Sequence, residues 1–213
     1  MTAAEHPGTA SLDPARAAQR QQVIAELMHT LERVPEQTEF TNSTLYKVWG
    51  PVAVLGLLVL QGVALMMGRL DLIACAAFLL LSALWITWQH RHAGRDVFMR
   101  LTRRQLFVDT LDKPIDLAKV DRIEVEKEAM GMLAQTLHLT DDAVLPTHRV
   151  VKMQAFCNQA LVERDHGPQV RILSAGLASQ GRTLGREEVI ALLSAYRDAA
   201  QAQQRLDALQ QHG

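Results

Sequence analysis

The stretch that decides the fold runs from Val48 to Trp88 and reads VWGPVAVLGLLVLQGVALMM, then GRLD, then LIACAAFLLLSALWITW. The first and third blocks contain no Asp, Glu, Lys, Arg or His. As a helix, each block is long enough to cross a hydrocarbon core about 30 Å thick. A helix in a soluble core is seldom this long and apolar on every side. We therefore predict a transmembrane hairpin over residues 45–89, with spans 48–67 and 72–88. The alternative is a pair of core helices in a soluble bundle.

The positive charges around the two spans predict their orientation. Basic residues follow the second span closely, at Arg91, Arg95, Arg100, Arg103 and Arg104. Arg33 and Lys47 precede the first span, and the short connection holds one Arg beside Asp71. Lys and Arg concentrate on the cytoplasmic side of membrane proteins. The pattern predicts a multi-pass protein of the inner membrane with both termini in the cytoplasm.

Aromatic residues mark the same two span ends. Tyr46 and Trp49 open the first span, and Trp85 and Trp88 close the second. A hairpin brings these ends to one interface, where amphipathic rings prefer to lie. We predict that these four aromatic residues and the five arginines named above are membrane-interface residues. The arginines at least set the topology, and the alternative is that they also bind anionic headgroups.

The rest of the chain divides into four segments. We expect a disordered N-terminus over residues 1–11, an amphipathic helix over 12–35 and a polar linker over 36–44. A cytoplasmic α+β domain is expected over 97–213, ending in a helix over 186–211. Period-two alternation predicts strands near 98–101, 105–109, 120–126, 133–140 and 170–173. Residues 150–162 fit either a helix or a strand, and 179–185 fit a loop.

Composition and motifs exclude several classes of function. The chain of 213 residues has a formal net charge of −1, so a dedicated nucleic-acid surface is not expected. Phosphate-binding glycine loops and the sequences HExxH, CxxC and GxSxG are absent. Cys157 is expected in the core, and the pair His90 and His92 is expected to be polar interface rather than a metal site. We predict no cofactor and no metal.

One group of residues offers an enzymatic alternative. His138, Asp141, Asp142 and His148 lie within eleven residues and would form an acid–base or metal cluster if they converged. A turn between strands explains the two acids equally well. This alternative therefore depends on whether the fold brings the four side chains together.

Two local patterns carry a resemblance to a known family. They are Leu101-Thr102-Arg103-Arg104-Gln105-Leu106-Phe107-Val108 and Lys113-Pro114-Ile115-Asp116-Leu117-Ala118-Lys119-Val120-Asp121-Arg122-Ile123. Together they resemble bacterial membrane proteins with a PH-like domain. In layout the resemblance covers about residues 97–210. It implies a half-open antiparallel barrel capped by the helix that starts at Arg186.

These observations lead to a functional prediction. We expect a non-enzymatic, membrane-anchored protein whose cytoplasmic domain binds a protein or a lipid headgroup. The expected partners are membrane lipid and either a protein or a second copy of the chain. One alternative is an accessory subunit of a membrane transport or secretion complex, and another is a membrane enzyme that acts on lipid.

Overall fold

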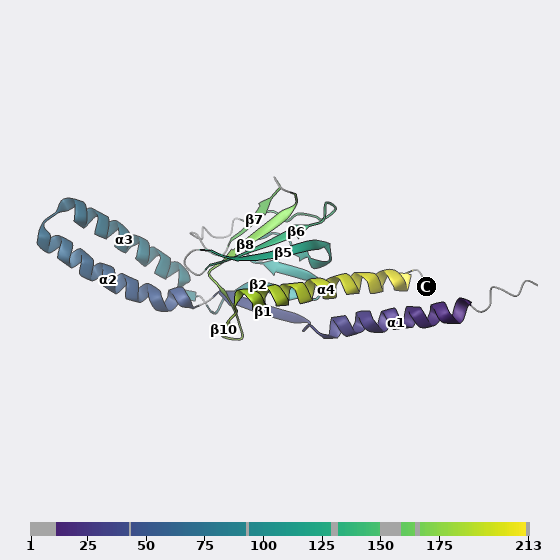
Figure 1. Ribbon diagram of the computed structural model, residues 1–213. Helices are drawn as coiled ribbons and strands as arrows, with labels where there is room; N and C mark the ends of the chain where they lie inside the picture. Colours follow the sequence, from purple (N-terminus) through teal and green to yellow (C-terminus); the bar gives the residue numbers. More distant parts are fainter. Residues whose placement is uncertain are drawn as a thin grey trace, which may run out of the picture.

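The computed structural model describes residues 12–42, 44–92, 94–128, 132–149, 159–164 and 167–211. The described chain has three parts (Figure 1). A two-helix hairpin projects from one side of a β-rich domain, and helices α1 and α4 run alongside and beyond its other side. The expected disordered N-terminus, Cys157 and most of the ambiguous segment 150–162 lie outside the described residues.

The elements alternate between helices and short strands. The helices are α1 (Leu12–Glu32), α2 (Leu45–Met67), α3 (Leu70–Gln89), the 3₁₀ turns η1 (His90–His92) and η2 (Leu117–Lys119), and α4 (Arg186–Gln211). The strands are β1 (Gln37–Asn42), β2 (Val97–Thr102), β3 (Gln105–Val108), β4 (Ile115–Asp116), β5 (Val120–Lys127), β6 (Leu133–Leu139), β7 (Gln159–Glu163), β8 (Gln169–Ser174), β9 (Leu177–Ser179) and β10 (Arg182–Thr183).

Helices α2 and α3 pack against each other and are both long and apolar enough to cross a membrane. Gly68 ends α2 in the left-handed conformation, and its N–H donates to the carbonyl of Leu65. Glycine adopts this conformation without steric cost, so the chain reverses within a few residues. At the other end, a Cβ placed on Gly50 would lie 2.6 Å from the Thr87 hydroxyl oxygen. The two helices are therefore in close contact at Gly50 and Thr87, near the end where the hairpin joins the domain.

The hairpin is inserted between two neighbouring strands of one sheet. Strand β1 pairs with β2 in antiparallel register, with Thr38 opposite Leu101 and Thr41 opposite Val97. The chain leaves the sheet at the end of β1 and re-enters it at the start of β2. We call this junction, where α2 begins and α3 ends, the base of the hairpin.

Residues 36–44 were predicted as a linker, and that prediction is wrong. They contain β1, which pairs with β2 on one side and β9 on the other. The segment carries one large apolar residue, Phe40, which is 1% exposed. Its neighbours Glu39 and Thr41 are polar because the other face of the strand is accessible. A single apolar residue is too little alternation to predict a strand.

Two antiparallel sheets and the C-terminal helix form the domain, so the fold is α+β as predicted. One sheet has the strand order β10-β9-β1-β2-β3-β4, and the other has the order β5-β6-β8-β7. Residues 179–185 were expected to be a loop but contain a tight hairpin between β9 and β10. Gln180 and Gly181 both have positive φ, which is the geometry of a two-residue hairpin turn.

Helix α4 closes the core on one side. It packs against β5 and η2, and its buried side chains include Val189, Leu193 and Tyr196. The rest of the core comes from inward-facing positions of both sheets, including Leu101, Leu106, Leu137 and Ile172, each fully buried. Helix α4 also packs against α1, and residues 198–209 of α4 face that helix across a cavity.

Candidate functional site

An aromatic and cationic cluster occupies the base of the hairpin. The rings of Trp85 and Trp88 lie 5.7 Å apart, and the guanidinium of Arg91 lies 4.3 Å from the centre of the Trp88 ring. Trp49 on α2 is 62% exposed. The side chain of Tyr46 lies outside what the structure describes. A cation over an indole face is an attractive contact that holds both groups in place.

The five arginines predicted at one interface do not share one location. Arg91 and Arg95 are exposed near the base of the hairpin, and Arg100 lies within β2. Arg103 and Arg104 lie beyond the far end of β2, about 20 Å along the strand direction from its start. The structure therefore separates Arg103 and Arg104 from the other predicted interface residues. The sequence spacing did not reveal this separation, because the direction of β2, which leads away from the hairpin, is not apparent from the sequence.

Both of these distal arginines bind protein groups. Arg103 donates through Nε and one terminal nitrogen to the carbonyl of Val34, at 3.2 and 3.0 Å. Arg104 lies 3.8 Å from the Asp207 carboxylate on α4. Arg103 thereby ties the end of α1 to the β2–β3 turn.

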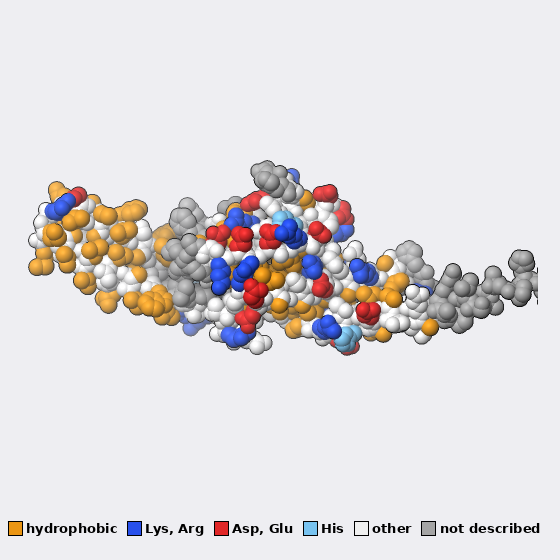
Figure 2. Space-filling view, in the orientation of Figure 1, with side chains coloured by type: hydrophobic (Ala, Val, Ile, Leu, Met, Phe, Trp, Pro, Cys, Tyr) orange, Lys and Arg blue, Asp and Glu red, His pale blue; other side chains and the backbone are white. Residues whose placement is uncertain are grey.

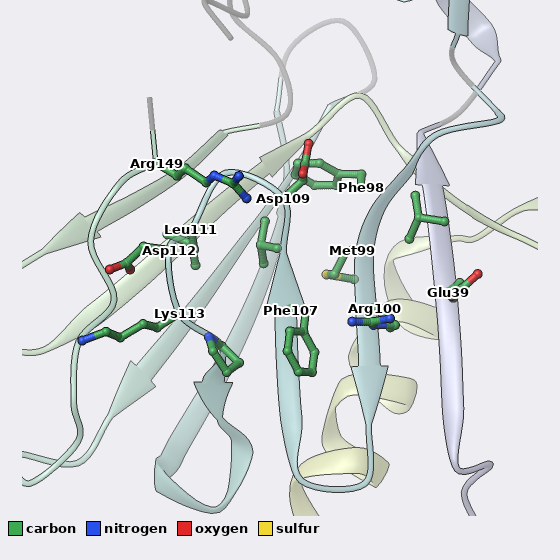
Figure 3. A pocket seen from close by; sticks show the side chains of 13 residues that line it. Glu39, Phe98, Met99, Arg100, Phe107, Asp109, Leu111, Asp112, Lys113 and Arg149 are labelled. Carbon is green, nitrogen blue, oxygen red and sulfur yellow. The ribbon is translucent and has the colours of Figure 1, made fainter. Parts of the chain in front are cut away.

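A cavity of about 520 Å³ lies on the outer face of the six-stranded sheet, close to the base of the hairpin. We call it the sheet cavity (Figure 3). Strands β1, β2 and β3 supply its floor through Glu39, Arg100 and Phe107, which are register neighbours across the sheet. The segment after β3 and Arg149 supply the remaining wall. This cavity was not predicted from the sequence.

Charged groups of both signs line the sheet cavity. The bases are Arg100, Lys113 and Arg149, and the acids are Glu39, Asp109 and Asp112. The guanidinium of Arg100 lies 4.7 Å from the centre of the Phe107 ring. Within the described residues, none of the three bases forms a salt bridge.

Two of the acids have hydrogen-bond donors from the protein. The backbone N–H of Thr147 donates to Asp112 at 2.6 Å, and this contact lowers the pKa of the Asp112 carboxyl below its usual value. Lys113 adds a smaller electrostatic effect in the same direction. Glu39 accepts a hydrogen bond from the Gln37 amide at 2.7 Å. The loop that contains Thr147 and Arg149 therefore favours the charged form of the Asp112 carboxyl.

The four residues of the enzymatic alternative do not form one cluster. Asp142 pairs with Lys119 and accepts from Thr140, whereas His138 lies 3.8 Å from Glu124 on β5. His148 forms an isolated antiparallel β-bridge with Leu111. Among the described residues, no three His, Cys, Asp or Glu side chains are arranged to hold a metal ion. The geometry gives this alternative no support.

A second cavity, of about 870 Å³, lies between α1 and α4. Leu27, Ala202 and Leu209 supply apolar walls, and Glu26 and Arg205 are among its charged residues. The two helices are joined at one end where Arg20 donates to the carbonyl of Leu209. We call this the α1–α4 groove.

Comparisons of the chain with models of protein families, with curated protein sequences and with solved structures give no match.

Proposed function

We propose that this protein is a membrane-anchored binding protein of the bacterial inner membrane. In this proposal α2 and α3 cross the bilayer as a hairpin, and the α+β domain lies against the cytoplasmic face. On the visible face, hydrophobic side chains cover much of the hairpin away from its tip, whereas charged side chains gather over the domain (Figure 2). An apolar surface of this extent on a pair of helices is stable in lipid and costly in water.

The groups at the base of the hairpin support this placement. Indole rings favour the boundary between headgroups and hydrocarbon, and a cation stacked on one of them keeps its charge at the same depth. Trp85, Trp88 and Arg91 have this arrangement. The tip holds the ion pair Arg69–Asp71, which is well exposed and suited to water on the opposite side.

The single observation that carries the proposal is the insertion of the hairpin between β1 and β2. Because β1 leads into α2 and α3 leads back through η1 to β2, the sheet is attached to the two helices at two points. A domain on one flexible linker would sample many orientations. Two short attachments instead hold one end of the sheet, and the sheet cavity beside it, near the bilayer surface.

For the domain we propose a PH-like arrangement. Two antiparallel sheets with a helix covering one side support it. Two features extend the pattern expected from the resemblance. The hairpin lies between the first two strands. Strands β9 and β10 extend the same sheet beyond β1.

Cysteine labelling tests the proposed topology. Cys75 and Cys157 are first replaced by Ala, and single cysteines are introduced as Arg69→Cys or Arg104→Cys. Intact spheroplasts are treated with a maleimide that does not cross membranes. We expect position 69 to react before lysis and position 104 only after lysis. Labelling at 104 but not 69 in intact cells would reverse the proposed orientation, and loss of the chain from carbonate-washed membranes would refute anchoring.

The α1–α4 groove favours a second candidate function, that of a subunit in a larger membrane assembly. Val23, which lines the groove, is 41% exposed, and Met28 elsewhere on α1 is 53% exposed. Purification in mild detergent tests this candidate by comparing the natural chain with a Val23→Asp, Met28→Glu variant. We expect an assembly subunit to lose its co-purifying membrane protein in the variant. Equal recovery from both chains would exclude the groove as the contact.

A further inference from the structure

We propose that the sheet cavity binds the headgroup phosphate of a membrane phospholipid. This assignment deepens the proposed function and rests on the hairpin being in the bilayer. Its chemical basis is a set of basic side chains that form no salt bridge with the described residues, lining a cavity beside the strand that follows the hairpin.

The first argument is the state of the cations. Arg100, Lys113 and Arg149 line the cavity and form no salt bridges with the described residues. Glu39 lies directly opposite Arg100 in the sheet register, yet the guanidinium stacks on Phe107 instead. Stacking fixes the plane of the guanidinium and leaves its N–H groups available. A planar fork of donors held in this way suits two phosphate oxygens.

The second argument concerns the acids of the cavity, which keep their negative charge but in two cases already accept hydrogen bonds from the protein. Asp112 accepts the Thr147 N–H, and Glu39 accepts the Gln37 amide. Asp109 lies at the end of the cavity nearest the hairpin, where its backbone N–H donates to the carbonyl of Phe98. In the proposed complex, Asp109 would lie beside the alcohol or amine of the headgroup rather than beside its phosphate.

The third argument is reach. Val97 and Phe98 line the cavity and are the first two residues of β2. Arg100 is two residues further along the strand, a distance of about 7 Å. The headgroup region of a bilayer is itself about 5–8 Å deep on each side of the hydrocarbon. The cavity therefore lies at the end of β2 that follows the hairpin, and it extends along the strand by about the depth of a headgroup.

The fourth argument is size and lining. A volume of about 520 Å³ lies within the usual range for small-ligand sites, about 300–1,000 Å³. Phe98, Phe107 and Pro114 give apolar wall beside the charges. Figure 3 shows Arg100 and Phe107 on neighbouring strands, with Arg149 on a separate segment on the hairpin side of Phe107. A phosphodiester with a glycerol backbone matches this combination of charged and apolar surface.

Native mass spectrometry of the full chain in mild detergent tests the proposal. The probes are dioctanoyl phosphatidylglycerol, dioctanoylglycerol, which lacks the phosphate, and glycerol 3-phosphate, which lacks the acyl chains. We expect the natural chain to retain the phospholipid at about tenfold lower concentration than dioctanoylglycerol, corresponding to about 1.4 kcal/mol. Arg100→Gln and Arg149→Gln should each remove this preference, and Arg100→Lys should keep part of it.

Arg104→Gln is the matched control, because Arg104 lies at the opposite end of the same strand pair. It should bind like the natural chain. Equal phospholipid binding by the natural chain and both Gln variants, confirmed as folded by circular dichroism, would overturn the proposal. Glycerol 3-phosphate binding as tightly as phosphatidylglycerol would also overturn it in favour of a soluble phosphate ester. Either result could occur while the cysteine labelling still reports a membrane hairpin, so the two proposals fail separately.

Discussion

The hydroxyl groups of Tyr196 and Thr38 lie 2.7 Å apart and join the C-terminal helix to the strand that leads into the hairpin. The Tyr196 hydroxyl also lies 3.2 Å from the carbonyl of Pro35, to which it donates. The tyrosine side chain is fully buried. Burial raises the pKa of its phenol, and Thr38 partly opposes this effect. Tyr196 thus connects α4 with Pro35, which lies between α1 and β1, and with Thr38 in β1.

Replacing Tyr196 by Phe should destabilise the domain by about 1–3 kcal/mol, because it removes two part-buried hydrogen bonds, each worth about 0.5–1.5 kcal/mol. Thr38→Ala should cost less, since it removes only one of the two contacts. Urea unfolding in detergent, followed by circular dichroism, measures both variants and the double variant. The two changes should be strongly non-additive. Fully additive losses would show that the Tyr196–Thr38 contact contributes little.

Gly50→Ala should lower the Tm of the hairpin, although alanine is the better helix former by about 1 kcal/mol. The new methyl group would overlap Thr87, whose hydroxyl donates to the carbonyl of Ala83. Gly62→Ala is the control, since nothing lies within 4 Å of that position. We expect Gly62→Ala to leave the Tm unchanged or raise it, and Thr87→Ala to restore the Gly50→Ala chain. Equal Tm values for the two alanine variants would contradict the close helix contact.

Arg103→Ala should destabilise the domain by about 1.5–3 kcal/mol, since a hydrogen bond from a charged donor to the carbonyl of Val34 is lost. Arg104→Ala should cost less than about 0.5 kcal/mol, because its ion pair with Asp207 is long and exposed. Urea midpoints for the two variants measure the difference. Equal urea midpoints for the two variants would show that the hydrogen bonds from Arg103 to Val34 contribute little to stability.

Stability should fall as the pH is lowered below about 4. The pKa of Asp112, Asp142 and Glu188 is lowered in the folded chain, chiefly by the Thr147 N–H, Lys119 and the Gly185 N–H respectively. The unfolded chain therefore binds more protons in acid, and stabilisation present above the usual carboxyl pKa is lost below it. Urea midpoints at pH 7 and pH 3 should differ less in Asp112→Asn, Glu188→Gln than in the natural chain. If the difference between the urea midpoints at pH 7 and pH 3 is the same in the variant, these two carboxyls do not cause the loss of stability in acid.

The sequence predicted the long elements well, because their periodicity extends over many residues. The hairpin helices and the helix from Arg186 to Gln211 agree with the predicted bounds to within a few residues. Strands β2, β3, β5, β6 and β8 also lie where alternation indicated. Within the ambiguous segment 150–162, Gln159 and the residues after it begin strand β7.

The sheet cavity could not have been predicted in the same way. Its floor combines Glu39 with Arg100 and Phe107, which the insertion of the hairpin separates in the sequence. Once β1 is taken for a linker, no pattern places Glu39 beside Arg100. Arg149 reaches the same cavity only because Arg149 and Thr110 are joined by a backbone hydrogen bond. Pairing between distant segments, rather than local propensity, determines this site.

The position of the hairpin within the sheet also sets an order of events during synthesis. Strand β1 leaves the ribosome before α2 and α3, yet its partners β2 and β9 are both synthesised after them. Chains emerge from the N-terminus at about 5–20 residues per second, so β1 waits unpaired for seconds while the hairpin is made. The sheet can close only after both helices have been synthesised. A chain stalled at that step therefore holds β1 without its partner strands.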